Sequence, residues 1–174
     1  SGLKFKAGAK VCLDSAVLPR DLDVSMCDKV DLSSCNLRGI KELKFKEGAK
    51  VDLAGAKNLP AVLDLSMCDE VWLGSANLRG VRKIKFKEGA KVYLSYAKKL
   101  PSILDVSMCD KVDFKGCDFG AVLRVRFKDK EQKKIFLRGV ENFSAMSVYG
   151  LAKDDEGKHG LGARLRRLFD GGME

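Results

Sequence analysis

Short tripeptides of the form apolar-x-apolar recur along most of the chain, separated by polar and turn-forming residues. Leu43-Lys-Phe45 and Val51-Asp-Leu53 are two examples, with Glu47-Gly48-Ala49 between them. Apolar side chains at every second position are typical of short β-strands with one buried face. No repeated segment carries the roughly ten residues of 3.6-residue periodicity that a helix requires. The pattern therefore predicts short strands joined by tight turns.

The tripeptides belong to a unit of about 20 residues that occurs seven times. The units of the type Val-x-Leu begin at intervals of 19, 21, 20, 21, 20 and 23 residues. Their first residues are Val11, Val30, Val51, Val71, Val92, Val112 and Ile135. Two versions of the unit alternate, one with a Lys-Glu-Gly-Ala turn and one with Ser-Met-Cys-Asp, so the full period is 40 or 41 residues. The polar run 129–134 stretches the last interval, where the repeat decays.

A 20-residue unit with two or three short strands is typical of one coil of a β-solenoid, in which each coil contacts only its neighbours. We therefore expect an all-β solenoid of about seven coils over residues 1–143, with a tail over 144–174. In the tail, Leu161, Leu165, Leu168 and Phe169 fall on one helical face, which predicts a short capping helix at about 161–169. A flexible tail and a partner-binding helix are the alternatives.

The repeat resembles two known families. Val30-Asp-Leu-Ser-Ser-Cys-Asn-Leu37 is similar to the L-x-L-x-x-[NC]-x-L segment of leucine-rich repeats, and Val112-Asp-Phe-Lys-Gly-Cys-Asp-Phe119 is similar to the unit of pentapeptide repeats. The sequence departs from leucine-rich repeats in two ways: the column that usually holds asparagine holds Ala or Cys here, and no helix is evident on the convex side. It departs from pentapeptide repeats because the five-residue period is interrupted in every coil. The resemblance implies a leucine-rich-repeat-like bacterial β-solenoid, and it implies a binding or interaction scaffold.

Outward-facing positions also form columns, because equivalent residues of adjacent coils lie about 4.8 Å apart. One column alternates in charge and is expected to fix the register of the stack: Lys4, Asp23, Lys44, Asp64, Lys85, Asp105 and Arg126. A second is mostly basic: Lys10, Lys29, Lys50, Glu70, Lys91, Lys111 and Lys134. A third contains no acids: Lys6, Ser25, Lys46, Ser66, Lys87, Ser107 and Lys128. Together the last two predict one basic side.

The composition of the chain limits which binding partners the basic side could have. The 174-residue chain is 45% apolar, which excludes wholesale disorder, and no apolar run approaches the ~20 residues of a membrane helix. The net charge of +9 permits an anionic partner, with a solvated face as the simpler interpretation. A nucleic acid is disfavoured because arginines are scarce and few aromatic residues interleave with the lysines.

The outward position of each Val-x-Leu unit carries two aromatic residues in neighbouring coils, Trp72 and Tyr93, which we expect to stack. An exposed aromatic pair on a flat strand face is a candidate contact site. The tail could equally cover it. The remaining members of this column are Cys12, Asp31, Asp52, Asp113 and Phe136.

The six cysteines do not favour a disulfide or metal framework. Cys27, Cys68 and Cys109 occupy the same turn in every second coil, where the other coils have Gly8, Gly48 and Gly89, and two coils separate them by about 9.6 Å. Cys35 and Cys117 stand in a column of alanines and are expected to be small core residues; Cys12 points outward. Free thiols favour a reducing compartment or a bacterial cytoplasm.

No catalytic, cofactor or metal site is expected. His159 is the single histidine, and no glycine-rich phosphate loop precedes a helix. The leading hypothesis is a non-catalytic scaffold for protein–protein interaction, and the alternative is a binder of anionic polymers such as polysaccharide, nucleic acid or lipid headgroups. Leu3 and Phe5 already occupy core columns, so we also expect an open N-terminal end. Such an end would join further upstream coils or a second molecule.

Overall fold

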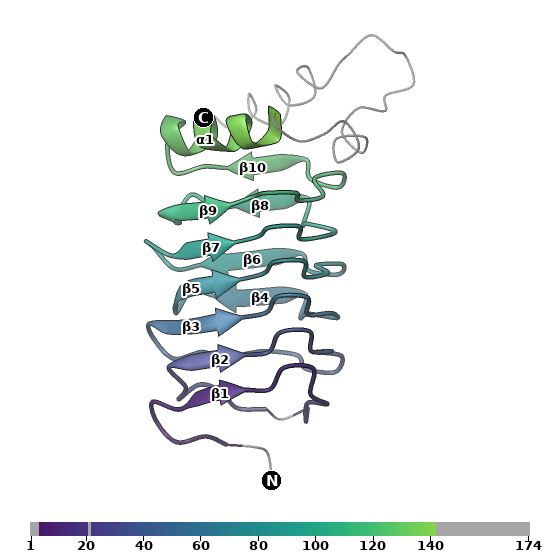
Figure 1. Cartoon of the computed structure of the whole chain (residues 1–174), viewed down its shortest axis with the longest axis vertical. Coiled ribbons are helices and arrows are strands. Elements are labelled where there is room, and N and C mark those ends of the chain that lie inside the picture. Colours follow the sequence, from purple (N-terminus) through teal and green to yellow (C-terminus); the bar gives the residue numbers. More distant parts are fainter. Residues whose placement is uncertain (1–3, 21, 142–174) are drawn as a thin grey trace.

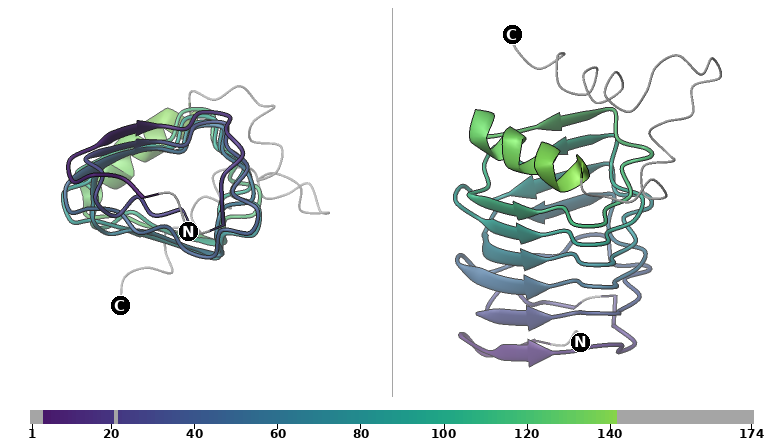
Figure 2. Two further views of the ribbon diagram at one scale, coloured as in Figure 1. Left: turned by 90° about the horizontal axis from the view of Figure 1, so that it is seen from below. Right: turned by 45° about the horizontal axis from the view of Figure 1, so that its top comes forward.

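The protein is a stack of short parallel strands, seen here in a computed structural model that describes residues 4–20 and 22–141. About six coils are piled along one axis, and the end-on view in Figure 2 shows successive coils lying over one another. The β-solenoid class is confirmed. Both the helix expected at 161–169 and the tail 144–174 lie outside the described residues.

One side of the stack is a six-stranded parallel sheet, which we call the front sheet. Its order is β1-β2-β3-β5-β7-β9 (Figure 1). The strands are β1 (Lys10–Cys12), β2 (Lys29–Asp31), β3 (Ala49–Asp52), β5 (Cys68–Trp72), β7 (Lys91–Tyr93) and β9 (Lys111–Asp113). Each strand contains the first two residues of a Val-x-Leu-type unit and one to three residues before them.

Behind the front sheet run strands made by the other tripeptide of the repeat. β4 (Val62–Leu65) pairs with β6 (Lys83–Phe86), and β8 (Ile103–Asp105) pairs with β10 (Arg124–Arg126), all in parallel. We call these the back strands. Figure 1 shows them running opposite to the front strands, as a continuous coil requires.

The front sheet is held in register by its central valines. Val11 pairs with Val30, Val30 with Val51, and so on through Val71 and Val92 to Val112. Val30, Val51, Val71 and Val92 are fully buried, while the residue before each valine lies on the outer face. Since side chains alternate along a strand, a slip of one residue would expose the whole column, which is why the register is so strongly specified.

A tight turn follows each front strand at the residue two positions after the buried Leu or Phe. These turn residues all have positive φ, between 55° and 67°: Ser15, Ser34, Gly55, Ser75, Tyr96 and Gly116. Small residues tolerate this left-handed conformation best, and glycine tolerates it freely. Tyr96 is the bulky exception.

Odd and even coils reach the front sheet by different corners, and here one sequence expectation is wrong. The even-coil cysteine pairs with an alanine of the odd coil, as Cys68 does with Ala49, and not with the neighbouring glycine. The aspartate that follows each of these cysteines forms a β-bulge. In the second coil, for example, the amides of both Asp28 and Lys29 donate to the Ala9 carbonyl. Asp110 and Lys111 repeat this arrangement on Ala90. The extra residue places an aspartate at the corner of every even coil.

The seventh repeat unit is helical, which corrects the expectation of seven coils. α1 (Lys130–Glu141) contains Ile135 and Leu137, and it lies across the top of β10 in Figure 1. Asp129 caps the helix, because its carboxylate accepts a hydrogen bond of 2.7 Å from the Gln132 amide. The Gln132 side chain in turn accepts one of 2.8 Å from the Lys128 amide. This polar start turns the chain into a helix where another strand was expected.

The helix covers the last coil with Phe136, which is 4% exposed. Its ring packs edge-on against Phe114 and Phe119, with centroid distances of 4.9 and 5.2 Å. Phe127 lies at 5.2 Å as well. The prediction that Phe136 continues the outward column is therefore wrong, because in a helix its side chain turns down onto the core. At the other end Phe5 and Leu13 are half-buried.

Candidate functional site

Two parallel lines of side chains run along the outer face of the front sheet. The lysine line comprises Lys10, Lys29, Lys50, Glu70, Lys91 and Lys111. The acid-aromatic line lies two residues further along each strand and comprises Cys12, Asp31, Asp52, Trp72, Tyr93 and Asp113. The valine column lies between them and points inward. Lys134 does not extend the lysine line, because it lies on α1, where it pairs with Glu131 at 3.9 Å.

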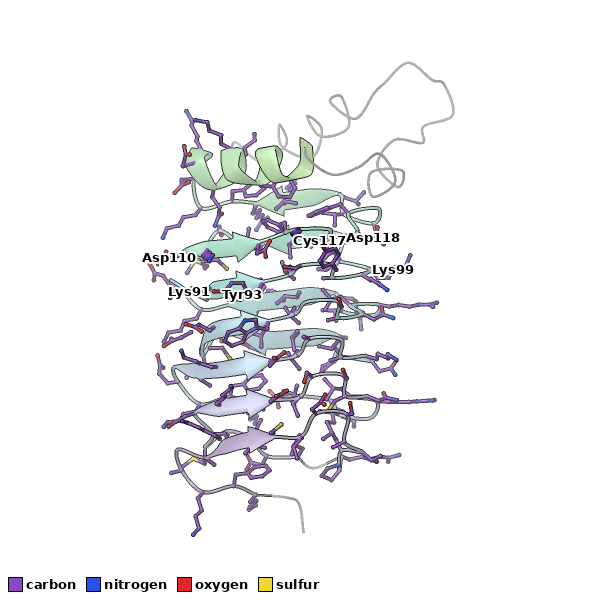
Figure 3. The ribbon with its side chains drawn as sticks, viewed as in Figure 1. Lys91, Tyr93, Lys99, Asp110, Cys117 and Asp118 are labelled. Atoms are coloured by element: carbon purple, nitrogen blue, oxygen red, sulfur yellow. The ribbon has the colours of Figure 1, made fainter. Side chains whose placement is uncertain are left out.

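Trp72 and Tyr93 form a stacked pair in the middle of this face, as predicted. Their ring centroids lie 5.6 Å apart and the ring planes differ by 9°. The Lys111 ammonium lies 5.3 Å from the centroid of the Tyr93 ring, at a distance suited to a cation–π contact. Figure 3 shows Tyr93 on the front of β7 with Lys91 toward the edge of the same strand. Both rings are half-buried, so their outer edges remain available for contact.

The lysine line is neutralised at only one point among the described residues. Glu70 accepts Lys50 at 3.4 Å and Lys91 at 3.7 Å, and thereby bridges three successive coils. Lys10 and Lys29 are neighbours in register and are exposed, and neither has an ion-pair partner in the described part of the chain. The N-terminal half of the line is consequently more basic than its centre.

Hydrogen bonds from the turns of the same or the preceding coil fix the carboxylates of the second line. Asp31 accepts hydrogen bonds from the Ser33 hydroxyl at 2.6 Å and the Ser33 amide at 3.0 Å, which hold the pKa of its carboxyl below the ordinary value. Asp52 accepts the Ala54 amide at 2.8 Å. Asp113 accepts the hydroxyl of Ser95 at 2.6 Å. Within the described residues none of the three forms an ion pair with a lysine.

The third column itself contains no acids, but three of its corner lysines are paired with acids that lie outside it. Lys46 binds Asp28 at 2.5 Å, and Lys87 binds Asp69 at 2.8 Å and Glu47 at 2.9 Å. Lys128 binds Asp110 in the same way at 2.5 Å. The bulged corners supply these aspartates; the periodicity places Asp28, Asp69 and Asp110 in a column of their own beside the lysine line, and the structure pairs them with the third column instead. Lys6 is exposed at the equivalent corner of the first coil.

The alternating ladder on the back strands forms as predicted over part of its length. Lys85 binds Asp64 at 2.5 Å and Arg126 binds Asp105 at 3.4 Å. Lys44 departs from the ladder and binds Glu42 of its own coil at 3.5 Å. These pairs are largely exposed and contribute register more than stability.

The thiols have the expected environments. Cys12 is exposed, and Cys27, Cys35, Cys68, Cys109 and Cys117 are buried and free. Burial raises the pKa of Cys68, Cys109 and Cys117 to about 12. The Cys117 thiol donates to the Leu94 carbonyl at 3.0 Å. Such thiols are protonated core side chains and are not nucleophiles.

The described residues hold no cluster of three or more potential metal ligands, and no described helix is long and apolar enough to cross a membrane. One open hollow is lined by Arg20, Asp23, Ser25 and Lys44 on the back near the first coils. A smaller one lies between β9 and α1, beside Lys111 and Gln132. In chemical terms, the front face offers non-covalent contact: cations, fixed carboxylates and two aromatic edges.

Comparison with protein-family models, with curated proteins and with solved structures found no match.

Proposed function

We propose that the chain is a non-catalytic repeat scaffold that binds another protein through the front sheet. The stacked Trp72–Tyr93 pair carries this proposal. The pair lies at the centre of a flat face, with exposed lysines on one side and Asp52 and Asp113 along its own line. Tryptophan and tyrosine are enriched among the residues that dominate interface energies, particularly when surrounded by polar groups.

The rigidity of the face supports this function. Every front strand is bonded to its neighbours along the stack, and the acids are anchored by Ser33, Ala54 and Ser95. A surface that is already ordered loses little side-chain freedom on binding. The deep interior contains hydrophobic side chains and no buried polar or charged ones among the described residues, so the recognition chemistry lies on the outside.

The proposal is tested by immobilising three versions of the chain and comparing which proteins each retains from a lysate of the source organism. The front variant is Trp72→Ser/Tyr93→Ser, and the matched control is Val62→Ser/Ile103→Ser, which removes two exposed apolar side chains from the back strands. We expect the wild type and the control to retain a common protein that the front variant retains at least about tenfold less. Equal retention by all three chains would overturn the proposal, with circular dichroism verifying that each is folded.

The alternative function is binding of an anionic polymer by the lysines. The uncompensated neighbours Lys10 and Lys29 favour it, whereas the pairing of Lys46, Lys87 and Lys128 with aspartates weakens it. Retention on heparin at low salt that falls steeply with salt would support this function. Its test is the loss of that retention in Lys10→Ala/Lys29→Ala, and absence of retention at low salt would exclude it.

We also propose that the coil is of a leucine-rich-repeat-like, bacterial kind. The segment Val30–Leu37 supports this, since its two apolar strand positions and its turn cysteine match the L-x-L-x-x-[NC]-x-L pattern. Val30, Leu32, Cys35 and Leu37 are all fully buried, as that pattern requires.

A further inference from the structure

We propose that the protein recognised by the front sheet is a second copy of this chain, bound face to face with the two solenoid axes parallel. This inference rests on the proposed function of the front sheet and names the partner. The observation behind it is the order of side chains across β2, β3, β7 and β9, four of the six front strands: a lysine, an inward valine, and an acid or aromatic residue. That order makes the face complementary to itself.

The symmetry follows from the position of the valine column. The lysine line and the acid-aromatic line lie on either side of it, about 6.6 Å apart along the strand. A two-fold axis that runs along the stack above the valines exchanges the two lines between the copies. Because a two-fold rotation has no translation, each coil then faces the same coil of its partner.

The resulting pairs are favourable in most coils. Lys29 faces Asp31 of the second copy, Lys50 faces Asp52, and Lys111 faces Asp113, each contact occurring twice by symmetry. In the fifth coil Lys91 faces the Tyr93 ring, a second cation–π geometry. The central aromatic pair becomes enclosed by charged pairs, which is the arrangement of an energetically dominant centre with a surrounding rim.

The opposite orientation is excluded by the same charges. A two-fold axis along the strands would set the lysine line against itself and the acids against the acids. Lys29, Asp31 and Asp113 have no ion-pair partner within the described part of their own chain, so they are available for the parallel arrangement. Exposed or half-exposed pairs of this kind determine orientation more than affinity.

The size of the face sets the expected strength. Five spacings between six strands give a height of about 24 Å, and the face is only a few side chains wide. An interface of this size is at the lower end for specific complexes, so the dimer is expected to be weak and sensitive to salt.

A charge-swap experiment on the full chain tests the orientation directly. The acidic variant is Lys29→Glu/Lys111→Glu, and the basic variant is Asp31→Lys/Asp113→Lys. From the native net charge of +9 these carry +5 and +13, so both remain positive and overall charge does not draw them together. The control is Lys83→Glu/Arg124→Glu on the back strands, which also carries +5 and alters two exposed side chains.

Sedimentation velocity at about 0.05 M salt is the measurement. We expect the wild type and the control to dimerise, each front variant alone to lose at least about tenfold in dimer affinity, and their equimolar mixture to recover it. Salt of about 0.5 M should dissociate all of them. Circular dichroism verifies folding, and the wild-type and control measurements stand even where a front variant fails to fold.

A wild type that stays monomeric at millimolar concentration would overturn the inference, and so would a mixture no better associated than its components. Neither result touches the proposed function. A protein other than this chain that is retained by the wild type and lost with Trp72→Ser/Tyr93→Ser would keep the front sheet as an interface and remove only the second copy as its partner.

Discussion

The ring of Tyr96 lies directly over Gly116 of the next coil. A Cβ at Gly116 would lie 2.3 Å from Cδ1 of the Tyr96 ring, well inside van der Waals contact. Tyr96 has a φ of 60° and Gly116 a φ of 65°, so both occupy the left-handed turn that follows a front strand. Tyr96 is 52% exposed, and the absence of a side chain at Gly116 gives its ring a surface to lie against.

Substitution of Gly116→Ala should therefore destabilise the protein through both the backbone and the ring. The left-handed conformation costs an alanine about 1 kcal/mol, and displacement of the ring adds a similar amount. Gly55→Ala is the matched control, because Gly55 has a φ of 67° and its nearest neighbour to a new Cβ lies 3.4 Å away. Urea unfolding of both variants measures the difference.

The added loss at Gly116 should disappear when Tyr96→Ser is combined with Gly116→Ala, since serine occupies the same turn at Ser34 and Ser75. Equal losses for Gly116→Ala and Gly55→Ala would show that the ring does not lie where it is described.

Much of this architecture is predictable from the sequence, because each unit repeats the burial pattern of the one before it. Seven units in phase, with Val before Leu, identify the inward columns, the lysine line and the Trp72–Tyr93 stack without any structural knowledge. The same repetition misled at Ile135, where Ile-x-Leu fits the strand pattern but lies in α1. The signal that separates the two is Asp129 followed three residues later by Gln132, a helix-capping pattern.

The corner pairs could not be predicted from columns alone. An alignment on valine places Cys68 opposite Gly48, whereas the strand pairing places it opposite Ala49. The bulge that follows shifts Asp69 outward to Lys87, eighteen residues away in sequence. A bulge adds one residue to one strand, as between the Ala49–Cys68 and Lys50–Glu70 pairs, and the spacing of the valines does not show where that residue lies.

The stability of α1 on the last coil should depend on Phe136. Phe136→Ala removes a ring enclosed by Phe114, Phe119 and Phe127, and the loss expected for a buried phenylalanine is about 3–5 kcal/mol. Hydrogen exchange should then accelerate in α1 and β10 before it does in β3 or β5, because each coil is stabilised by its neighbours. Lys130→Ala, an exposed position at the start of α1, is the control and should leave exchange unchanged. Uniform acceleration along the stack would contradict a local capping role.

Thiol reactivity should separate one cysteine from five. Cys12 is exposed and should react with a thiol reagent in the native protein within minutes, while the other five react only on unfolding. The pKa of about 12 at Cys68 and Cys109 leaves almost no thiolate at neutral pH. Intact-mass analysis counts the labels, with Cys12→Ser as the control that should take none. Two or more native labels on the wild type would show that the core columns are open.

The Asp31 carboxyl should titrate with a pKa below its ordinary value of 3.8, chiefly because the Ser33 hydroxyl and then its amide bond the charged form. Because this pKa is lower in the folded state, the ionised carboxylate stabilises the fold at pH values above the pKa of the unfolded chain. That stabilisation is lost as the pH falls through the pKa of the folded state. Ser33→Ala should raise the pKa of Asp31, while Asp23, bonded by Ser25, should keep its lowered pKa. Side-chain NMR titration measures both. An unchanged Asp31 in this variant would refute the assignment.

The register of adjacent coils is the claim on which both lines of the front face depend, and one substitution tests it. Cys12 and Asp31 are partners in β1 and β2, so Asp31→Cys places two thiols on strands about 4.8 Å apart, within the range of a disulfide. Asp52→Cys places the second thiol two coils from Cys12, about 9.6 Å away. Mild oxidation of dilute protein at high salt, followed by peptide mapping, should give an intramolecular disulfide between Cys12 and the introduced cysteine in the first variant and no intramolecular bond in the second. A bond in the second variant, or none in the first, would contradict the stacked register.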